Sequence, residues 1–340
     1  MSTRSNLRVA VVGAGQMGAD HVARITHKTK GAVVSAIVEP DRHRAEAVLA
    51  EAPGASLFTR IEDAIDEGAL DAVLVATPGQ FHAPVLAPAI DARLPILVEK
   101  PLAMDSASSW EIIEREQKLD RPHIQVGFMR RFDAGYLELR ELVSSGELGE
   151  LLMVHGVHRT PSVPGSYTQE MLIEDSVAHE FDVLPWIAGS PVTSVEVRHT
   201  RSNRLSSSHL REPILVLIEL ANGVLIDVEM NVGVQFGYQV GTEAVFESGL
   251  ARIGQESRMQ TWSEGRVSMA HHTSYKSRFV EAYDRQIQAW VDAVHGGSLI
   301  AGPNAWDGYL ASLATEAGVK ALTHEGRHTV PVPEKPAFYV

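Results

Sequence analysis

An aspartate and a histidine stand four residues apart in the segment IEDSVAHEFD, from Ile173 to Asp182. In an α-helix this spacing puts two residues on one face, so the carboxylate of Asp175 and the imidazole of His179 can meet, with Asp182 following on the same side. A carboxylate that bonds one ring nitrogen orients the ring and leaves the other nitrogen to take a proton. A surface hydrogen bond is the simpler interpretation of the pair taken alone.

Oxidation of a hydroxyl group also requires a positive charge near its oxygen, and a lysine can provide it. Lys100 stands in the segment Glu99-Lys100-Pro101, directly after an apolar run. An ammonium beside a hydroxyl oxygen stabilises the negative charge that develops there, while His179 accepts the proton. We therefore expect Lys100, Asp175 and His179 to be catalytic, and Glu99 to pair with Lys100.

A glycine-rich turn, GAGQMG, follows the apolar run Leu7–Val12 and precedes a helical pattern. In a G-x-G-x-x-G turn, Gly13 permits the tight bend, Gly15 lets the backbone approach a pyrophosphate, and Gly18 lets helix and strand pack closely. Alone, the motif also fits a plain turn in another α/β protein. The residues of this turn that we expect to contact a dinucleotide are Gly13, Gly15, Gln16 and Met17.

An acid ends the second apolar run, AVVSAIVEP, about 20 residues beyond the third glycine. There Glu39 can accept hydrogen bonds from the adenosine ribose and would repel a 2′-phosphate. The sequence therefore predicts NAD rather than NADP, with Arg42 close enough to soften the repulsion. The alternative is that Glu39 is a solvated residue at a strand end.

Two further apolar runs, DAVLVATP and PILVEKP, are separated by helical stretches. Strands alternating with helices indicate an α/β domain with a doubly wound parallel sheet, in which ligands lie beyond the carboxyl ends of the strands. His82 would there stack near the nicotinamide or cap a helix. The polar residues at or just past these ends, which we expect near the cofactor, are Thr77, His82, Glu99 and Lys100.

The second half of the chain is richer in strands, and an Asn222-Gly223 turn between two apolar runs predicts a hairpin. We expect an α+β domain with a large open, mostly antiparallel sheet. The predicted organisation is an NAD-binding Rossmann domain over residues 1–125, and a substrate-binding and oligomerisation domain over 126–340 whose late helices can pack back on the first. An uncovered sheet face requires a partner, so we expect a homo-oligomer.

Composition excludes several classes of protein. The formal net charge is −13 and the basic residues are scattered, so no nucleic-acid partner is expected. The absence of cysteine excludes disulfides and thiolate metal sites. No apolar run reaches the roughly 18 residues of a membrane span, and a cytoplasmic protein is expected. His155 and His158 fall on opposite faces of a strand, so no metal site is predicted.

Several motifs together resemble one family, the inositol dehydrogenase branch of the glucose–fructose oxidoreductase/inositol dehydrogenase/rhizopine catabolism (Gfo/Idh/MocA) superfamily. The similarity extends over nearly the whole chain. Its most specific parts are GFMRRFDAGY and AWDGY, whereas EKP and D-x-x-x-H are shared across the superfamily. The motifs that carry it are GAGQMG, VEKPLA, QVGFMRRFDAGY, HRTP, EDSVAHEFDVLPW, FGYQV and GPNAWDGY.

The resemblance implies an NAD-dependent tetramer that oxidises a ring hydroxyl of an inositol, myo-inositol first, to the inosose. Lys100, Asp175 and His179 match the family's catalytic residues. The alternatives are a dehydrogenase of another inositol isomer (scyllo or D-chiro) or of a pyranose sugar, and a non-catalytic NAD-binding regulator. Thr160 replaces an asparagine common in relatives, which leaves the preferred isomer open. The residues that match positions lining the polyol pocket are Arg130, His158 and Tyr238, although Arg130 can instead pair with Asp133 structurally.

Overall fold

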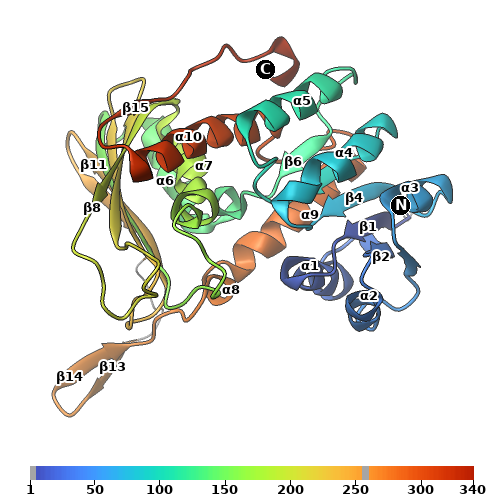
Figure 1. Ribbon diagram of the computed structural model, residues 1–340, viewed down its shortest axis with the longest axis horizontal. Coiled ribbons are helices and arrows are strands. Elements are labelled where there is room, and N and C mark those ends of the chain that lie inside the picture. Colours follow the sequence, from blue (N-terminus) through green and yellow to red (C-terminus); the bar gives the residue numbers. More distant parts are fainter. Residues whose placement is uncertain (1–4, 255–259) are drawn as a thin grey trace. The chain divides into compact units, whose positions relative to one another are not determined.

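The computed structural model describes residues 5–254 and 260–340, and the chain divides into two compact units (Figure 1). Each unit gathers segments that are distant in the sequence. The first unit comprises Met1–Met129, Glu281–Ser312 and Glu334–Val340. The second unit comprises Arg130–Val280 and Leu313–Pro333.

A six-stranded sheet with the order β3-β2-β1-β4-β5-β6 forms the centre of the first unit. All five neighbouring pairs are parallel, which is the doubly wound arrangement predicted from the sequence. The short strands β3 and β6 were not predicted. The strands are β1 (Leu7–Val12), β2 (Ala32–Val38), β3 (Ser56–Phe58), β4 (Ala72–Val75), β5 (Ile96–Val98) and β6 (Ile124–Val126).

Helices cover both faces of this sheet, so its strands are apolar on both sides. Along β1, Val9 and Val11 pack into one hydrophobic cluster with Trp290 of α9, whereas Ala10 and Val12 pack into the other. The helices are α1 (Gln16–His27), α2 (Arg42–Leu49), α3 (Ile61–Asp66), α4 (His82–Asp91), α5 (Ser106–Glu116) and α9 (Val280–Gly296), with short turns η1 (Gly79–Phe81) and η4 (Ala337–Tyr339).

The second unit is built on a seven-stranded sheet with the order β12-β11-β7-β10-β9-β8-β15. It is mostly antiparallel, with β10 and β7 as its parallel pair. The predicted hairpin joins β9 to β10, and Gly223 has a φ of 88° in its turn. The strands are β7 (Leu151–Arg159), β8 (Val192–His199), β9 (Ile214–Leu220), β10 (Leu225–Asn231), β11 (Gln239–Phe246), β12 (Leu250–Ile253) and β15 (His328–Thr329).

Helices α6 and α7 lie against one face of this sheet (Figure 1). Residues of β9 and β10 alternate between buried and half-buried, as expected when one face is covered. A separate hairpin, β13 (Gln260–Ser263) with β14 (Arg266–Met269), projects from the unit. The helical segments are η2 (Met129–Phe132), α6 (Ala134–Ser145), η3 (Leu172–Val177), α7 (Ala178–Ala188), α8 (Tyr275–Arg278) and α10 (Ala305–Thr323), which begins in the first unit.

A bilayer span would require a longer and more apolar helix than any found in residues 5–254 and 260–340.

Candidate active site

The glycine turn after β1 has the geometry that its sequence predicts. Gly13 adopts a φ of +96°, and a Cβ there would lie 2.8 Å from the carbonyl oxygen of Ala76. A Cβ on Gly18 would collide with the carbonyl oxygen of Gly13, whereas one on Gly15 would meet nothing within 4 Å. The turn is therefore closed towards the protein and open at Gly15, where helix α1 begins without a side-chain cap. Such a helix start favours a phosphate group.

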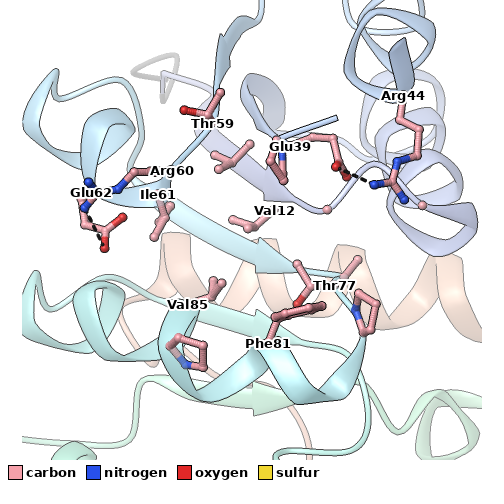
Figure 2. A pocket seen from close by; sticks show the side chains of 17 residues that line it. Val12, Glu39, Arg44, Thr59, Arg60, Ile61, Glu62, Thr77, Phe81 and Val85 are labelled. Carbon is pink, nitrogen blue, oxygen red and sulfur yellow. Dashed lines mark hydrogen bonds and ion pairs between the residues drawn. The ribbon is translucent and has the colours of Figure 1, made fainter. Parts of the chain in front are cut away.

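A cavity of about 490 Å³ lies at this turn, beyond the carboxyl ends of the parallel strands (Figure 2). Its wall combines apolar side chains such as Ile61, Phe81 and Val85 with the predicted residues Gly13, Gly15, Glu39 and Thr77. Gln16, Met17, His82, Glu99 and Lys100 are outside the set of lining residues. The Oγ1 atom of Thr77 is buried and has no hydrogen-bond partner among the described residues. The glycine turn has free space at Gly15, and the Thr77 hydroxyl lacks a partner within the described residues. Both features are compatible with a bound dinucleotide.

Glu39 is tied into the wall of this cavity by three contacts. Its Oε2 accepts a hydrogen bond from Ala14 N–H at 2.8 Å, and its Oε1 accepts one from Asp41 N–H at 3.0 Å. Arg44 Nη2 donates to the same Oε1 at 3.1 Å, as Figure 2 shows. The predicted role of Arg42 is wrong, because Arg42 points to Glu46 on the exposed surface and Arg44 is the neighbouring cation of Glu39.

The residues around Lys100 are fixed by two histidines. His21 on α1 lies with Nε2 2.6 Å from Oε1 of Glu99, an ion pair or hydrogen bond that the sequence did not predict. His82 neither caps a helix with its ring nor lines the cavity. Its Nδ1 is 2.6 Å from the carbonyl oxygen of Pro101, and its Nε2 is 2.9 Å from that of Thr77. Burial lowers the pKa of His82.

The segment that carries Asp175 and His179 is not one regular α-helix, so that prediction is wrong in its first turn. Leu172–Val177 forms a π-helical segment, η3, which contains Asp175, and His179 lies in the following α7. A π-helical turn holds more residues than an α-helical turn, so this segment departs from the regular helix that the spacing predicted. Such segments are frequent at functional sites. Gly189 ends α7 in the left-handed conformation, as predicted.

Asp182, which the helical pattern placed on the same side as Asp175 and His179, pairs with Arg131. It forms a two-point ion pair with Arg131, with Nη2–Oδ1 at 2.5 Å and Nε–Oδ2 at 3.1 Å. The guanidinium of Arg131 also lies over the ring of Trp186, 5.4 Å from its centroid. Asp182 is therefore engaged in holding α7 to the segment that precedes α6.

Arg130, His158 and Tyr238 come together in the interior of the second unit. Arg130 is 1% exposed and forms an ion pair with Glu180, which is 3% exposed. His158 Nδ1 lies 3.3 Å from Arg130 Nη2 and 3.2 Å from Glu180 Oε1. The His158 and Tyr238 rings are in edge contact at 6.3 Å. Asp133, the alternative partner for Arg130, pairs with Arg278 instead at 2.7 Å.

Neighbouring charges and burial set the pKa values of Glu180 and Tyr238 in this cluster. Burial by itself raises the pKa of Glu180, but the charge of Arg130 and the contact with His158 outweigh it and lower the pKa to about 2. Burial also raises the pKa of Tyr238, so its hydroxyl stays protonated. A neutral phenol, an imidazole and a charge-paired guanidinium together offer several hydrogen-bond donors and acceptors, as a polyhydroxylated ligand requires.

His155 is on the other face of the same strand, with Nδ1 2.5 Å from Asp227 Oδ2. Within residues 5–254 and 260–340, no three acidic or histidine side chains are grouped as metal ligands.

Comparison with known families matches both parts of the chain. The family model described as "Oxidoreductase family, NAD-binding Rossmann fold" matches residues 7–128. The model described as "GFO/IDH/MocA C-terminal domain" matches residues 136–252. The chain belongs to the Gfo/Idh/MocA oxidoreductase family. The resemblance inferred from the motifs is thus confirmed, and so is the fold.

Individual members of the Gfo/Idh/MocA family are similar over the full chain. Inositol 2-dehydrogenase of Corynebacterium glutamicum is 65% identical over 334 residues, which cover 98% of this chain and 99% of the relative. Inositol 2-dehydrogenase of Leifsonia xyli is 64% identical over 339 residues, which cover 100% of this chain and 100% of the relative to the nearest per cent. The crystal structure of myo-inositol dehydrogenase from Lactobacillus casei with NAD(H) and myo-inositol has a TM-score of 0.96 at 30% identity, covering 98% of this chain and 100% of that one.

Sequence reasoning missed several residues of this Gfo/Idh/MocA site. Glu180 had a usable signal, because a charged residue within the apolar stretch of α7 must be buried with a counter-ion. His21 had a weaker one, its position three residues after Gly18 on the inner side of α1. Arg44 had none, because the choice between it and Arg42 depends on how α2 is oriented at the end of β2.

Proposed function

We propose that this protein is an NAD-dependent inositol 2-dehydrogenase, which oxidises a ring secondary hydroxyl of an inositol, myo-inositol first, to the inosose. The observation that carries the proposal is the 65% identity, over 98% of the chain, to the Corynebacterium glutamicum enzyme of that name. The similar Lactobacillus casei structure, which was solved with NAD(H) and myo-inositol, supports it.

The first unit is the proposed NAD-binding part. The pyrophosphate would bind at Gly13 and Gly15, at the start of α1, where the open cradle supports it. The adenosine ribose would bind beside Glu39, whose carboxylate accepts from ribose hydroxyls and repels a 2′-phosphate. Glu39 therefore supports NAD over NADP, and Thr77 offers a hydroxyl that needs a partner. Gln16, Met17, His82, Glu99 and Lys100 remain proposed cofactor neighbours.

The proposed chemistry removes a proton from the substrate hydroxyl and a hydride from the carbon that bears it. NAD, when bound, accepts the hydride at C4 of its nicotinamide. His179 takes the hydroxyl proton, and Asp175 orients the imidazole for that step. Lys100 lies beside the substrate oxygen and stabilises its developing negative charge. All three roles rest on the family motifs in which these residues stand.

Arg130, His158 and Tyr238 are proposed to hold the substrate ring. Because Nδ1 of His158 faces Arg130 and Glu180, its Nε2 is the nitrogen available to a ligand hydroxyl. The hydroxyl of Tyr238, kept protonated by burial, can donate or accept beside it. Thr160, which replaces a common asparagine amide, is the proposed source of any difference in isomer preference.

We also propose a homotetramer. The face of the large sheet opposite α6 and α7 carries half-buried apolar side chains, among them Met153, Val157, Leu215 and Leu217. Apolar side chains on this face, which stand among charged residues such as Asp227 and Glu229, support packing against a second copy of the chain. Light scattering of the purified protein should give four times the chain mass, and a monomer mass would overturn the proposal.

The test of the proposed function is NADH formation with a panel of substrates: myo-, scyllo- and D-chiro-inositol, D-glucose and D-xylose, with NADP in parallel. We expect turnover of myo-inositol with NAD at the highest kcat/KM of the panel. Turnover of the sugars alone would agree with NAD-dependent oxidation of a hydroxyl group but would reject inositol as the substrate. Tight NAD binding without turnover of any compound would reject the enzyme and support a regulator.

A further inference from the structure

The two residues that flank Lys100 are each held by a buried histidine. On one side, Nε2 of His21 lies 2.6 Å from Oε1 of Glu99. On the other, Nδ1 of His82 lies 2.6 Å from the carbonyl oxygen of Pro101. His21 is 1% exposed and His82 is 0% exposed, so neither contact competes with bulk water.

In the contact between His21 and Glu99, the histidine is the hydrogen-bond donor. Its Nδ1 is buried and has no hydrogen-bond partner in the described part of the chain, so the proton belongs on Nε2, which donates to Glu99. The far side of Glu99 is equally confined. A Cβ on Gly127, just after β6, would lie 3.0 Å from Oε2 and 3.1 Å from Cα of Glu99. The Glu99 side chain is thus fixed between α1 and the turn after β6.

The His82 contact joins the ends of two neighbouring strands. While Nδ1 faces Pro101, Nε2 lies 2.9 Å from the carbonyl oxygen of Thr77, which follows β4. The rigid ring therefore sets the gap between the turns after β4 and β5. Those turns pack tightly, since a Cβ on Gly79 would lie 3.2 Å from Cδ of Pro101 and 2.9 Å from Sδ of Met104. The backbone on the carboxyl side of Lys100 has no room to shift.

We propose that His21 and His82 are positioning residues for Lys100, which fix the chain on both sides of it and so fix where its ammonium group is presented. The inference rests on the proposed function, in which Lys100 stabilises charge on the substrate oxygen. Stabilisation of a transition state depends steeply on position, and a displacement of about 1 Å costs up to about a hundredfold in rate. The histidines contribute to catalysis through Lys100 without touching substrate.

The experiment compares His21→Leu with His21→Gln, whose amide can still donate to Glu99. We expect His21→Leu to lower kcat by roughly ten- to a hundredfold, with KM for inositol and Kd for NAD changed by less than about threefold. His21→Gln should recover most of kcat. Should His21→Leu not fold, His82→Gln is measured instead; its single amide nitrogen cannot face both carbonyl oxygens as the two ring nitrogens do, and we expect a several-fold loss of kcat with KM for inositol changed by less than about threefold.

A double-mutant cycle with Lys100→Met separates positioning from a structural role. If His21 acts through Lys100, adding His21→Leu to Lys100→Met should leave the residual rate unchanged. An equal loss of rate in both backgrounds, or a His21→Leu enzyme with unaltered kcat, would overturn the inference. Full activity of Lys100→Met alone would instead reject the proposed role of the lysine, so the two failures are distinguishable.

Discussion

Glu39 and Arg44 form an ion pair in the wall of the cofactor cavity, with Oε1 and Nη2 3.1 Å apart. Arg60 and Glu62 form a similar pair elsewhere on the wall, at 3.4 Å (Figure 2). Each of these two arginines in the cavity wall is thus matched by a carboxylate. We infer that the proposed preference for NAD depends on this pair, because Glu39 would repel a phosphate and also binds Arg44.

Glu39→Gln should therefore change the choice of cofactor. The amide oxygen can still accept from Ala14 N–H, so the glycine turn keeps its support, while the negative charge is lost and Arg44 keeps Asp41 as its carboxylate partner. We expect kcat/KM to fall about tenfold with NAD and to rise about tenfold with NADP, the scale of one charged hydrogen bond. The double variant Glu39→Gln/Arg44→Met should lose the NADP gain. An unchanged NADP-to-NAD ratio in the single variant would show that the pair does not set it.

Thr77→Val tests whether the cavity holds the dinucleotide. The Oγ1 of Thr77 has no partner within the described chain, so replacing it with a methyl group should leave the free energy of unfolding of the unliganded protein unchanged or higher. Loss of a hydrogen bond to NAD should raise the Kd by a factor of about 2 to 10. Ser109→Ala is the matched control.

The hydroxyl of Ser109 is also buried, but it donates to the carbonyl oxygen of Asp105 at 2.9 Å. Its removal should lower the unfolding free energy and leave the Kd for NAD unchanged. Calorimetry of binding and urea denaturation measure both quantities. The same Kd for Thr77→Val as for wild type would place NAD elsewhere.

The Arg130–Glu180 pair predicts a pH dependence of stability. The pKa of Glu180 is lowered from 4.5 to about 2, so its stabilising contribution is complete above pH 4.5 and is lost as pH falls through the folded-state pKa. Between pH 6 and 3.5 the free energy of unfolding, measured with urea, should fall by about 1 kcal/mol more for the wild type than for Glu180→Gln. Glu46→Gln, at the exposed pair with Arg42, should follow wild type. Parallel curves for wild type and Glu180→Gln would contradict the assignment.

His179→Ala should lower kcat by about 10²- to 10⁴-fold, the usual loss when a general base is removed. NAD should still bind, since the cavity of the first unit contains none of the second unit's residues. Asp175→Asn should have a smaller effect, because the histidine remains. The control is His27→Ala, at an exposed contact with Glu51. Stopped-flow formation of NADH measures each rate, and a His179→Ala enzyme within tenfold of wild type would remove His179 from its role.

Much of the fold followed from local patterns, and the exceptions have physical causes. Strand β4 and, apart from Arg8, strand β1 are apolar runs close to proline or glycine, which is why they were predicted. Strands β3 and β6 are three residues long, too short to show a period. The π-helical segment at Asp175 was not predicted, because the sequence there has the pattern of an amphipathic α-helix.

The site was predicted less completely than the fold. The glycine turn, Glu39 and Thr77 were expected together because parallel strands deliver their carboxyl ends to one edge. Ion-pair partners were not, since they depend on how distant elements meet. Asp133 pairs with Arg278, which is 145 residues away, and Glu99 pairs with His21, which is 78 residues away. Spacing along the chain carries no information about such contacts.

The most direct test of the central claim follows the hydride itself. Myo-inositol carrying deuterium at C2 is incubated with the purified enzyme and NAD, and the reduced cofactor is examined by NMR. We expect one deuterium at C4 of the nicotinamide and a keto group at C2 of the product. Reduced cofactor without deuterium, or no reduced cofactor at all, would contradict it.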